Sequence, residues 1–172
     1  MSRINAISLE TATDATRAVL EGVKKKIGFL PNLFATLAKA PVALDTYVQA
    51  SATLGKSSLS AKEKEAVYLA TSQVNGCDYC LAAHTFFGSK AGLSAEDIVA
   101  ARQGELNAYA ALAYQLTESR GHLSDEQIAA ARAAGIDDSK IIEVIAVVAV
   151  QTLTNYLNNV ALTEIDFPTI DA

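Results

Sequence analysis

The sequence predicts an all-α fold, and three observations lead to that prediction. Helix-forming alanine, leucine, glutamate and lysine dominate the 172 residues. Only three prolines occur, and Pro31 and Pro41 stand where a predicted helix begins, a position that proline tolerates. No segment shows the sustained alternation of apolar and polar residues that a half-buried strand needs. We expect one domain over residues 1–172, because no linker or composition shift divides the chain.

Serine caps mark three of the predicted helix starts. In each, a serine precedes an acidic or amide side chain by three positions, so that the two residues can satisfy each other's unpaired backbone amides. The pairs are Ser60 with Glu63, Ser94 with Asp97, and Ser124 with Gln127. The predicted helices span residues 14–27, 32–38, 41–54, 60–74, 76–91, 94–101, 105–119, 124–133 and 138–162, the last with a break near Thr154.

Two segments of the chain share a weak similarity in the spacing of their residues, which suggests a duplicated helical pair. Glu65 precedes Cys77, Cys80 and His84 by twelve, fifteen and nineteen positions. Glu143 precedes Asn155, Asn158 and Leu162 by the same distances. A second copy of this kind would have lost both thiols and the imidazole, its asparagines would bond within the fold, and its Tyr156 would pack. The other interpretation is two helical stretches that match only in apolar character.

Charge and hydropathy exclude some function classes. The formal net charge is −5, and the 14 basic residues are scattered, which disfavours nucleic acid as a partner. The only basic run, residues 24–26, is expected to be a solvated helix end. The most apolar window, residues 144–150, is short against the roughly 20 residues of a membrane span, and no secretory signal is visible at the N-terminus. We expect a cytoplasmic protein without a membrane span, whose 51% hydrophobic content favours self-association.

The most informative motif holds both cysteines of the chain. Cys77 and Cys80 are separated by two residues, and His84 follows as one of only two histidines. On a helix these three side chains would project within roughly 60° of one another. In a reducing compartment such a cysteine pair is more often catalytic or metal-binding than a static link.

The motif has the parts that thiol chemistry needs. A thiol attacks as its thiolate, which helix N-terminal amides and the helix dipole stabilise. If Asn75 and Gly76 open the helix, both cysteines lie in its first turn. His84, one turn beyond Cys80, can take the thiol proton directly or through a water, and Glu65 on the preceding helix can orient the imidazole.

The spacing of Glu65, Cys77, Cys80 and His84 resembles the pattern of the alkyl hydroperoxidase D (AhpD-like) family within the carboxymuconolactone decarboxylase superfamily. The stretches at residues 28–34 and 85–88 are similar to segments of its peroxidase-related members. The resemblance implies an all-α thiol peroxidase, assembled as trimers or hexamers. We expect it to work without a metal or an organic cofactor.

By the same resemblance, Cys80 attacks the hydroperoxide and becomes a sulfenic acid, and Cys77 condenses with it to a disulfide. His84 and Glu65 form the proton relay, and an external dithiol, a lipoyl group or another thiol carrier, reduces the disulfide. The best-studied members carry a histidine just before the second cysteine, where this chain has Tyr79. The relay is therefore either shorter here or uses the phenol.

Other interpretations stay open at this point. The dithiol can serve a disulfide reductase or a redox sensor without peroxidase activity, or the cysteines can be structural core residues. Cys77, Cys80, His84 and Glu65 can also supply four zinc ligands, although structural zinc sites usually draw on two separated knuckles. Decarboxylase chemistry on a lactone is a less favoured alternative, because the decarboxylases of the superfamily that this chain resembles do not need the dithiol. Two minor expectations concern single residues: His122 lies in a surface loop, and four phenylalanines belong to the core or a subunit interface, or shape access for an organic hydroperoxide. These are Phe29, Phe34, Phe86 and Phe87.

Overall fold

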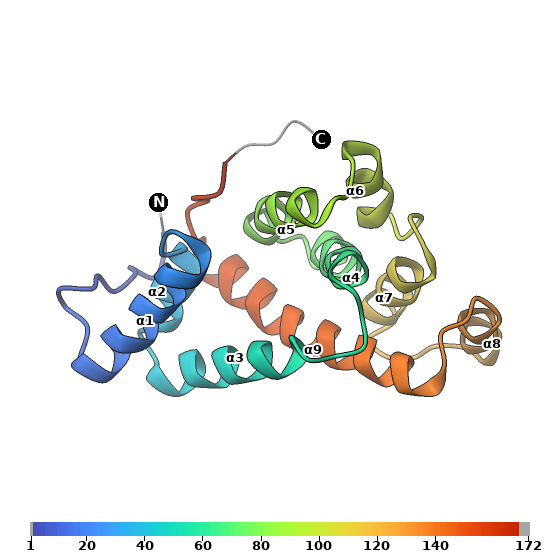
Figure 1. Ribbon diagram of the computed structural model, residues 1–172, viewed down its shortest axis with the longest axis horizontal. Helices are drawn as coiled ribbons and strands as arrows, with labels where there is room; N and C mark the ends of the chain where they lie inside the picture. Colours follow the sequence, from blue (N-terminus) through green and yellow to red (C-terminus); the bar gives the residue numbers. More distant parts are fainter. Residues whose placement is uncertain (1, 169–172) are drawn as a thin grey trace.

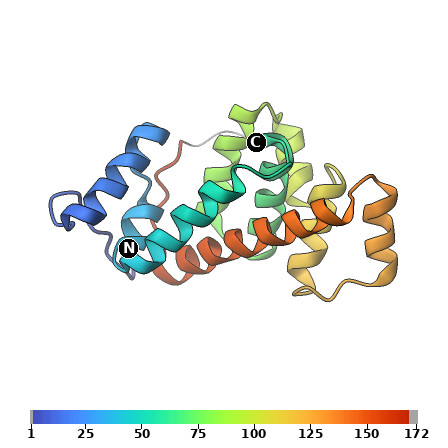
Figure 2. The same cartoon turned by 60° about the horizontal axis from the view of Figure 1, so that its bottom comes forward.

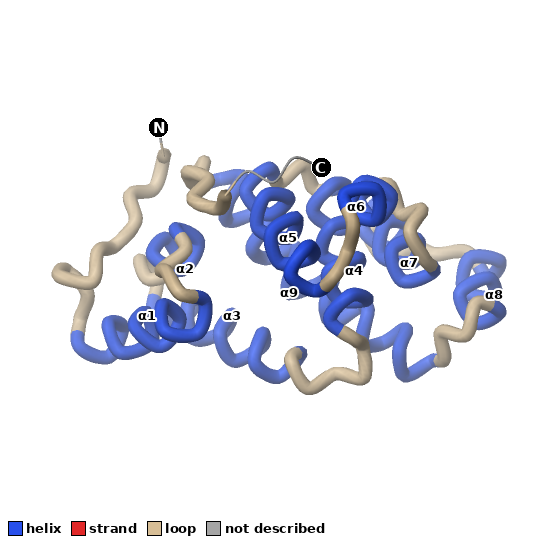
Figure 3. The backbone as a smooth tube through the Cα atoms, turned by 45° about the horizontal axis from the view of Figure 1, so that its top comes forward, coloured by secondary structure: helices blue, strands red, loops and turns tan. Residues whose placement is uncertain are grey.

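Residues 2–168, which the computed structural model describes, form nine α-helices and no strand (Figures 1 and 3). The helices are α1 (Asp14–Ile27), α2 (Asn32–Leu37), α3 (Pro41–Leu54), α4 (Ala61–Val74), α5 (Asp78–Ala91), α6 (Ala95–Arg102), α7 (Ala108–Glu118), α8 (Asp125–Ala133) and α9 (Asp138–Ala161). The all-α prediction is confirmed. Most of the predicted boundaries lie within two residues of the observed ones, because local capping signals set them.

The three serine caps form as predicted. In each, the serine hydroxyl accepts the N–H three residues on, and the side chain at that position accepts the N–H of the serine. The helix expected at 105–119 begins later, at Ala108, because Asn107 is its cap: its side chain accepts the N–H of Ala110 at 3.0 Å. The sequence analysis missed this asparagine as a start signal.

Helix α9 is continuous, so the predicted break near Thr154 is wrong. The Thr154 hydroxyl donates to the carbonyl of Gln151 at 2.8 Å, within the same helix. The apolar window at 144–150 belongs to a helix of 24 residues that, by length and composition alone, is long and apolar enough to cross a membrane. Of its most apolar stretch, 44% is buried inside the domain, so α9 serves as a core helix of this fold.

Helix α4 lies at the centre of one half of the molecule and packs against α5, α6, α7 and α9. Their shared core includes the fully buried side chains of Val67, Leu69, Val144 and Val147. Burying a branched aliphatic side chain of this kind stabilises the fold by about 1.5–3 kcal/mol. This core holds α4, and with it Glu65, in a fixed position.

A second core joins α1, α2 and α3 to the start of α5 and to the C-terminal segment. Leu20, Leu37 and Leu44 are buried there together with both cysteines. Helix α9 runs the length of the molecule from one core to the other and contacts α2, α3, α4, α5 and α7 (Figure 2). The cysteine pair therefore lies where the two halves of the molecule meet on α9.

The two segments with parallel spacing differ in structure. Residues 65–84 span the end of α4, a turn and the start of α5, whereas residues 143–162 lie almost entirely in α9. They therefore do not form a repeated helical pair. Asn155 and Asn158 do bond within the fold, as expected, but Tyr156 does not pack, because 60% of it is exposed.

Candidate active site

A sharp turn between α4 and α5 sets the position of the cysteines. Gly76 adopts a left-handed backbone with φ of 61°, a conformation that a residue with a side chain rarely takes. The chain then enters α5 with Cys77 as the N-cap, whose Sγ accepts the backbone N–H of Cys80 at 3.3 Å. Cys77 was expected inside the first helical turn. It caps that turn instead, and Cys80 is the third residue of the helix.

Cys77 and Cys80 form a disulfide, with their Cα atoms 5.3 Å apart. Both residues are buried, with exposed fractions of 0% and 3%. The pair is therefore close enough to cycle between dithiol and disulfide without a rearrangement of the backbone. Its burial means that a reactant reaches the sulfurs only through a cavity or a local opening.

His84 and Glu65 meet across α5 and α4. The Nδ1 atom of His84 lies 2.8 Å from Oε2 of Glu65, and both side chains are mostly buried. The ring of Tyr68 stacks on the imidazole, with centroids 4.4 Å apart and planes 25° from parallel. The carboxylate and the phenol ring fix the orientation of the imidazole, so that its Nε2 atom remains for a reactant.

His84 follows Cys80 by one helical turn, but among the described residues it makes no hydrogen bond to either sulfur. Apo structures often show catalytic contacts that tighten only when a substrate is bound. The structure thus brings all four predicted site residues to one region, and it joins them in two pairs, the disulfide and the histidine–carboxylate pair.

Tyr79, between the cysteines, is engaged away from this relay. Its hydroxyl donates to Oδ1 of Asp166 at 2.8 Å and accepts the backbone N–H of Leu33 at 3.1 Å. Burial raises the pKa of the Tyr79 phenol well above its usual range, and Asp166 adds to that effect. The phenol therefore ties α5 to α2 and to the C-terminal segment, and its hydroxyl does not contact His84 or Glu65 among the described residues.

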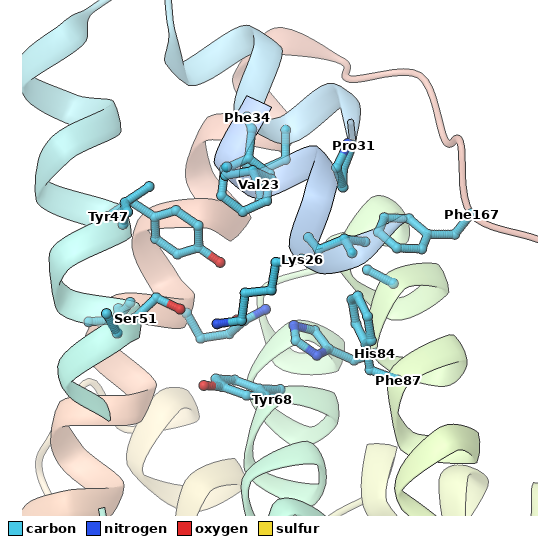
Figure 4. Close-up of a pocket in the computed structure, with 18 of the residues that line it drawn as sticks. Val23, Lys26, Pro31, Phe34, Tyr47, Ser51, Tyr68, His84, Phe87 and Phe167 are labelled. Atoms are coloured by element: carbon cyan, nitrogen blue, oxygen red, sulfur yellow. The ribbon is translucent and has the colours of Figure 1, made fainter. Parts of the chain in front are cut away.

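A cavity of about 520 Å³ opens beside the histidine (Figure 4). Its lining is mainly aromatic and aliphatic, and it includes Ala83 and His84, which follow Cys80 by one turn of α5, but neither cysteine. The aromatic members are Phe34, Tyr47, Tyr68, Tyr79, Phe87 and Phe167. Burial raises the pKa of Tyr47 to about 12, so this phenol stays a neutral hydrogen-bond donor at physiological pH. The volume and lining suit an apolar organic molecule.

The polar groups of the cavity come from several elements. Lys26, at the end of α1, points into the cavity toward Tyr68, so it is not only part of a solvated helix end (Figure 4).

Of the four phenylalanines considered above, Phe34 and Phe87 line the cavity. Phe29 and Phe86 pack against Phe167 instead. His122 is exposed outside any helix, as expected.

Helix α9 supplies polar contacts that the sequence analysis did not place at the site. Nδ2 of Asn158 donates to Sγ of Cys80 at 3.3 Å. Asn155 donates to the Ser72 hydroxyl at 3.2 Å and accepts from Asn75 at 2.9 Å. The two asparagines were expected to bond within the fold, but no local pattern indicates that one of them reaches the reactive sulfur.

The four side chains considered as zinc ligands do not converge. Cys77 and Cys80 are joined to each other, and His84 is joined to Glu65. Within residues 2–168 no group of three or more histidine, cysteine, aspartate or glutamate side chains is arranged to hold a metal ion. This geometry does not favour the zinc interpretation.

Comparison with known families agrees with this geometry. The model of the Carboxymuconolactone decarboxylase family matches residues 36–116, the part of the chain that contains Glu65, Cys77, Cys80 and His84. Residues 36–116 therefore resemble the Carboxymuconolactone decarboxylase family. The search of curated proteins gave no significant match.

Solved structures share the AhpD-like fold over nearly the whole chain. One is an alkylhydroperoxidase AhpD core, an uncharacterized peroxidase-related protein from Ralstonia eutropha JMP134, at 23% identity and a TM-score of 0.85, covering 96% of this chain and 92% of that one. A peroxidase-related protein from Silicibacter sp. TM1040 is 20% identical with a TM-score of 0.79, over 94% and 92% of the two chains. A cysteine-to-alanine variant of the debrominase Bmp8, in complex with 2,3,4-tribromopyrrole, is 19% identical with a TM-score of 0.80, over 96% and 92%.

The family match also separates two groups of site residues in this protein. The disulfide and the histidine–carboxylate pair lie inside the matched segment. Lys26, Asn158 and Asp166 lie outside it and reach the site from α1, α9 and the C-terminal segment. The family pattern therefore describes the motif, and the three-dimensional fold is needed to see what surrounds it.

Proposed function

We propose that this protein is a thiol-dependent peroxidase that reduces organic hydroperoxides through a Cys77–Cys80 dithiol/disulfide cycle. One hydroperoxide and two thiols give one alcohol, one water and one disulfide. The observation that carries the proposal is the disulfide itself. It forms at the first turn of α5, one turn before a histidine that a carboxylate holds in place. A merely structural pair would need neither the histidine nor the carboxylate.

In the first step the Cys80 thiolate attacks the outer oxygen of the hydroperoxide. The O–O bond breaks, Cys80 becomes a sulfenic acid, and the alkoxide takes up the proton that the thiol gave up. Cys80 is the third residue of α5, where unpaired backbone amides and the helix dipole favour negative charge. In the second step the Cys77 thiol displaces water from the sulfenic acid and forms the disulfide.

His84 moves the proton between these groups. It takes the proton of the Cys80 thiol, directly or through a water, and returns it to the departing alkoxide. Glu65 stabilises the imidazolium that forms in between, because its carboxylate lies 2.8 Å from Nδ1. Tyr68 covers one face of the ring and limits its rotation.

The aromatic cavity supports an organic hydroperoxide as the substrate. Ala83 and His84 line it one helical turn after Cys80, and neither sulfur lines it, so a hydroperoxide bound there would reach Cys80 through a local opening on the histidine side. An external dithiol, a lipoyl group or another thiol carrier, completes the cycle by reducing the disulfide. A cytoplasmic location, which we expect from the sequence, provides the reducing conditions for that step.

The experiment that tests the proposal is steady-state turnover with dihydrolipoamide as the reductant. Cumene hydroperoxide should disappear in proportion to dihydrolipoamide oxidation, and the Cys80→Ser variant should show no turnover. Reduction of the protein disulfide by dihydrolipoamide without any peroxide consumption would contradict the proposal and support a disulfide reductase or redox sensor.

A reductive dehalogenase is the second candidate, and the cavity is the observation that favours it. Its aromatic walls also suit a halogenated aromatic ring, and the similar fold of the debrominase Bmp8 was solved with such a ring bound. An aryl bromide and two thiols would give the dehalogenated arene, hydrogen bromide and the disulfide. Bromide release from 2,3,4-tribromopyrrole, measured under the same conditions, decides between the two reactions.

We further propose that the protein is a homo-oligomer, a trimer or hexamer by family resemblance, that associates through α9. One face of this helix carries large exposed apolar side chains along most of its length, at helical spacing. They are Ile142, Ile145, Leu153, Tyr156 and Val160. A second copy of the same chain is the partner that a continuous apolar stripe of this length suits.

Light scattering should show an oligomer for the native chain and a monomer for Ile145→Glu. A monomeric native chain at micromolar concentration would contradict this assignment.

A further inference from the structure

Asn158 contacts the sulfur that carries the proposed chemistry, although the two residues are 78 positions apart in the chain. Its Nδ2 donates a hydrogen bond to Cys80 Sγ at 3.3 Å, and only 3% of the residue is exposed. Its Oδ1 is buried and has no hydrogen-bond partner among residues 2–168. A buried acceptor without a donor destabilises the state in which it occurs. The disulfide state of this site therefore contains an unsatisfied amide beside the reactive sulfur.

The neighbouring asparagines show why Asn158 stays in this position. Asn155 is satisfied by Ser72 and Asn75, and Asn159 donates to the backbone carbonyl of Asn75 at 2.8 Å. These contacts fix α9 against the turn that leads into α5. Of the three asparagines, only Asn158 directs its amide at a sulfur.

The two redox states use this amide differently. In the disulfide, neither sulfur carries a hydrogen, so no thiol can donate to Oδ1. Reduction adds two electrons and two protons and breaks the S–S bond, which leaves two thiols. A Cys80 thiol then carries a hydrogen that it can donate to the Asn158 amide, whose Nδ2 lies 3.3 Å from this sulfur in the disulfide and whose Oδ1 has no partner among residues 2–168. If Cys80 instead releases its proton, the thiolate is a charged acceptor for the Nδ2 hydrogen, and hydrogen bonds to charged acceptors are the stronger kind.

We propose that Asn158 is a further catalytic residue, which stabilises the reduced Cys77–Cys80 pair over the disulfide and the Cys80 thiolate over the thiol. The inference deepens the proposed function and rests on its dithiol cycle. Both effects favour the reduced, reactive form of the site. They make the disulfide easier for an external dithiol to reduce, and they raise the fraction of Cys80 that can attack a peroxide at neutral pH.

The test compares Asn158→Leu, which keeps the size of the side chain but removes its polar atoms, with Asn159→Leu as the matched control. Asn159 is the next residue of the same helix and touches no sulfur. Each variant is equilibrated with mixtures of reduced and oxidised lipoamide, and the thiol fraction is read by mass spectrometry after alkylation. For Asn158→Leu the equilibrium constant for reduction should fall about tenfold, which is about 30 mV for a two-electron couple. The control loses a bond to the Asn75 carbonyl but none to a sulfur, so its equilibrium constant should change far less than that of Asn158→Leu.

The thiolate part of the proposal has its own readout. In a Cys77→Ser background, the rate of Cys80 alkylation by iodoacetamide is followed as a function of pH. Asn158→Leu should move the midpoint upward by about one pH unit, because the thiolate loses a charge-assisted hydrogen bond. A midpoint equal to that of the Cys77→Ser parent, together with a lipoamide equilibrium equal to that of the native protein, would overturn the proposal.

A measurement on the native sequence covers the case in which Asn158→Leu does not fold. With ¹⁵N-labelled asparagine, the side-chain amide hydrogens of Asn158 should shift downfield and exchange more slowly with water when the disulfide is reduced, while those of Asn155 stay in place. Unchanged Asn158 resonances would overturn the proposal. None of these measurements contains a peroxide, so their outcome is separate from the success or failure of the proposed peroxidase reaction.

Discussion

The segments 65–84 and 143–162 share the spacing of their polar residues but differ in structure. In the first, Glu65 lies on α4 while Cys80 and His84 lie on α5, and the turn between the helices folds the carboxylate back onto the imidazole. In the second, Glu143 and Asn158 lie on the one helix α9. Glu143 binds Ser58 at one end of the helix, and Asn158 reaches Cys80 near the other.

One position explains most of this difference. Gly76 in the first segment corresponds to Thr154 in the second. Glycine takes the left-handed conformation that the turn needs, whereas a β-branched threonine avoids it and remains helical. Equal spacing in the sequence therefore gives two helices in one segment and a single helix in the other.

The difference shows that the two segments are complementary parts of one site and not two versions of it. The first segment supplies the sulfurs and the proton relay. The second supplies the amide that contacts Cys80 and the contacts that hold the turn. Substitutions in the two segments should therefore differ in size and in what they affect.

The largest effect is expected from the cysteines of the first segment. Cys80→Ser should abolish the first reaction with peroxide, because serine is not a comparable nucleophile. Cys77→Ser should still form one sulfenic acid and then stop, since no thiol is left to condense with it. Trapping with a dimedone reagent distinguishes these outcomes, and equal first-step rates in the two variants would overturn the assignment of roles.

The next effect concerns the relay. His84→Ala should lower peroxide turnover at neutral pH by about 100-fold or more, and the rate should recover in part as pH rises, because hydroxide replaces the missing base. Glu65→Gln should lower the rate in the same direction. Its counterpart Glu143→Gln should leave turnover unchanged. A flat pH response of His84→Ala would remove the histidine from the mechanism.

A third prediction concerns Tyr79, which corresponds to Leu157 in the second segment. Tyr79→Phe leaves Asp166 and the N–H of Leu33 without their buried partner, so it should destabilise the fold by about 1–3 kcal/mol. Because the folded state raises the pKa of this phenol, its contribution is fully present below the usual tyrosine pKa of about 10 and declines above it. Urea unfolding should show a difference at pH 7 that shrinks as pH rises above about 10. A difference that grows with pH would contradict the role given to the phenol.

Exchanging the residues at the turn tests the structural comparison itself. Gly76→Thr should destabilise the fold by about 1–2 kcal/mol or more, because a threonine is forced into a left-handed backbone. Thr154→Gly should cost only about 0.3 kcal/mol by helix propensity, with a further loss from its buried side chain, and it should leave α9 intact. Thermal unfolding gives both values. A Gly76→Thr variant as stable as the native protein would show that the turn does not depend on the glycine.

The smallest effect is expected at Glu143. The hydroxyl of Ser58 makes the largest contribution to lowering the pKa of this carboxyl below its usual range, and the backbone N–H of Ser58 makes the next largest. Its stabilising contribution is therefore present above the usual pKa of about 4.3 and is lost as pH falls through the lower folded value. Glu143→Gln should be slightly less stable than the native protein at pH 7 and equally stable at pH 2. Equal stability at both values would show that the contact contributes nothing.

Local signals explain which features could be predicted from the sequence. The serine caps, the prolines and the short CxxC spacing lie within a few residues, so they indicated the helices and the paired cysteines directly. The meeting of His84 with Glu65 followed from two adjacent helices joined by a short turn. The contact of Asn158 with Cys80 and that of Tyr79 with Asp166 depend on how distant helices pack, and no local pattern encodes them. The continuity of α9 past Thr154 depends on packing against distant helices and on the bond of its hydroxyl to the Gln151 carbonyl.

The most direct test of the dithiol cycle is a single turnover of the reduced, metal-free protein. One equivalent of cumene hydroperoxide is added, free thiols are counted, and the intact mass is measured before and after the addition. The proposed function predicts the rapid loss of two thiols and of the mass of two hydrogens, with Cys77 and Cys80 recovered in one cross-linked peptide. Unchanged thiols and an unchanged mass would contradict it.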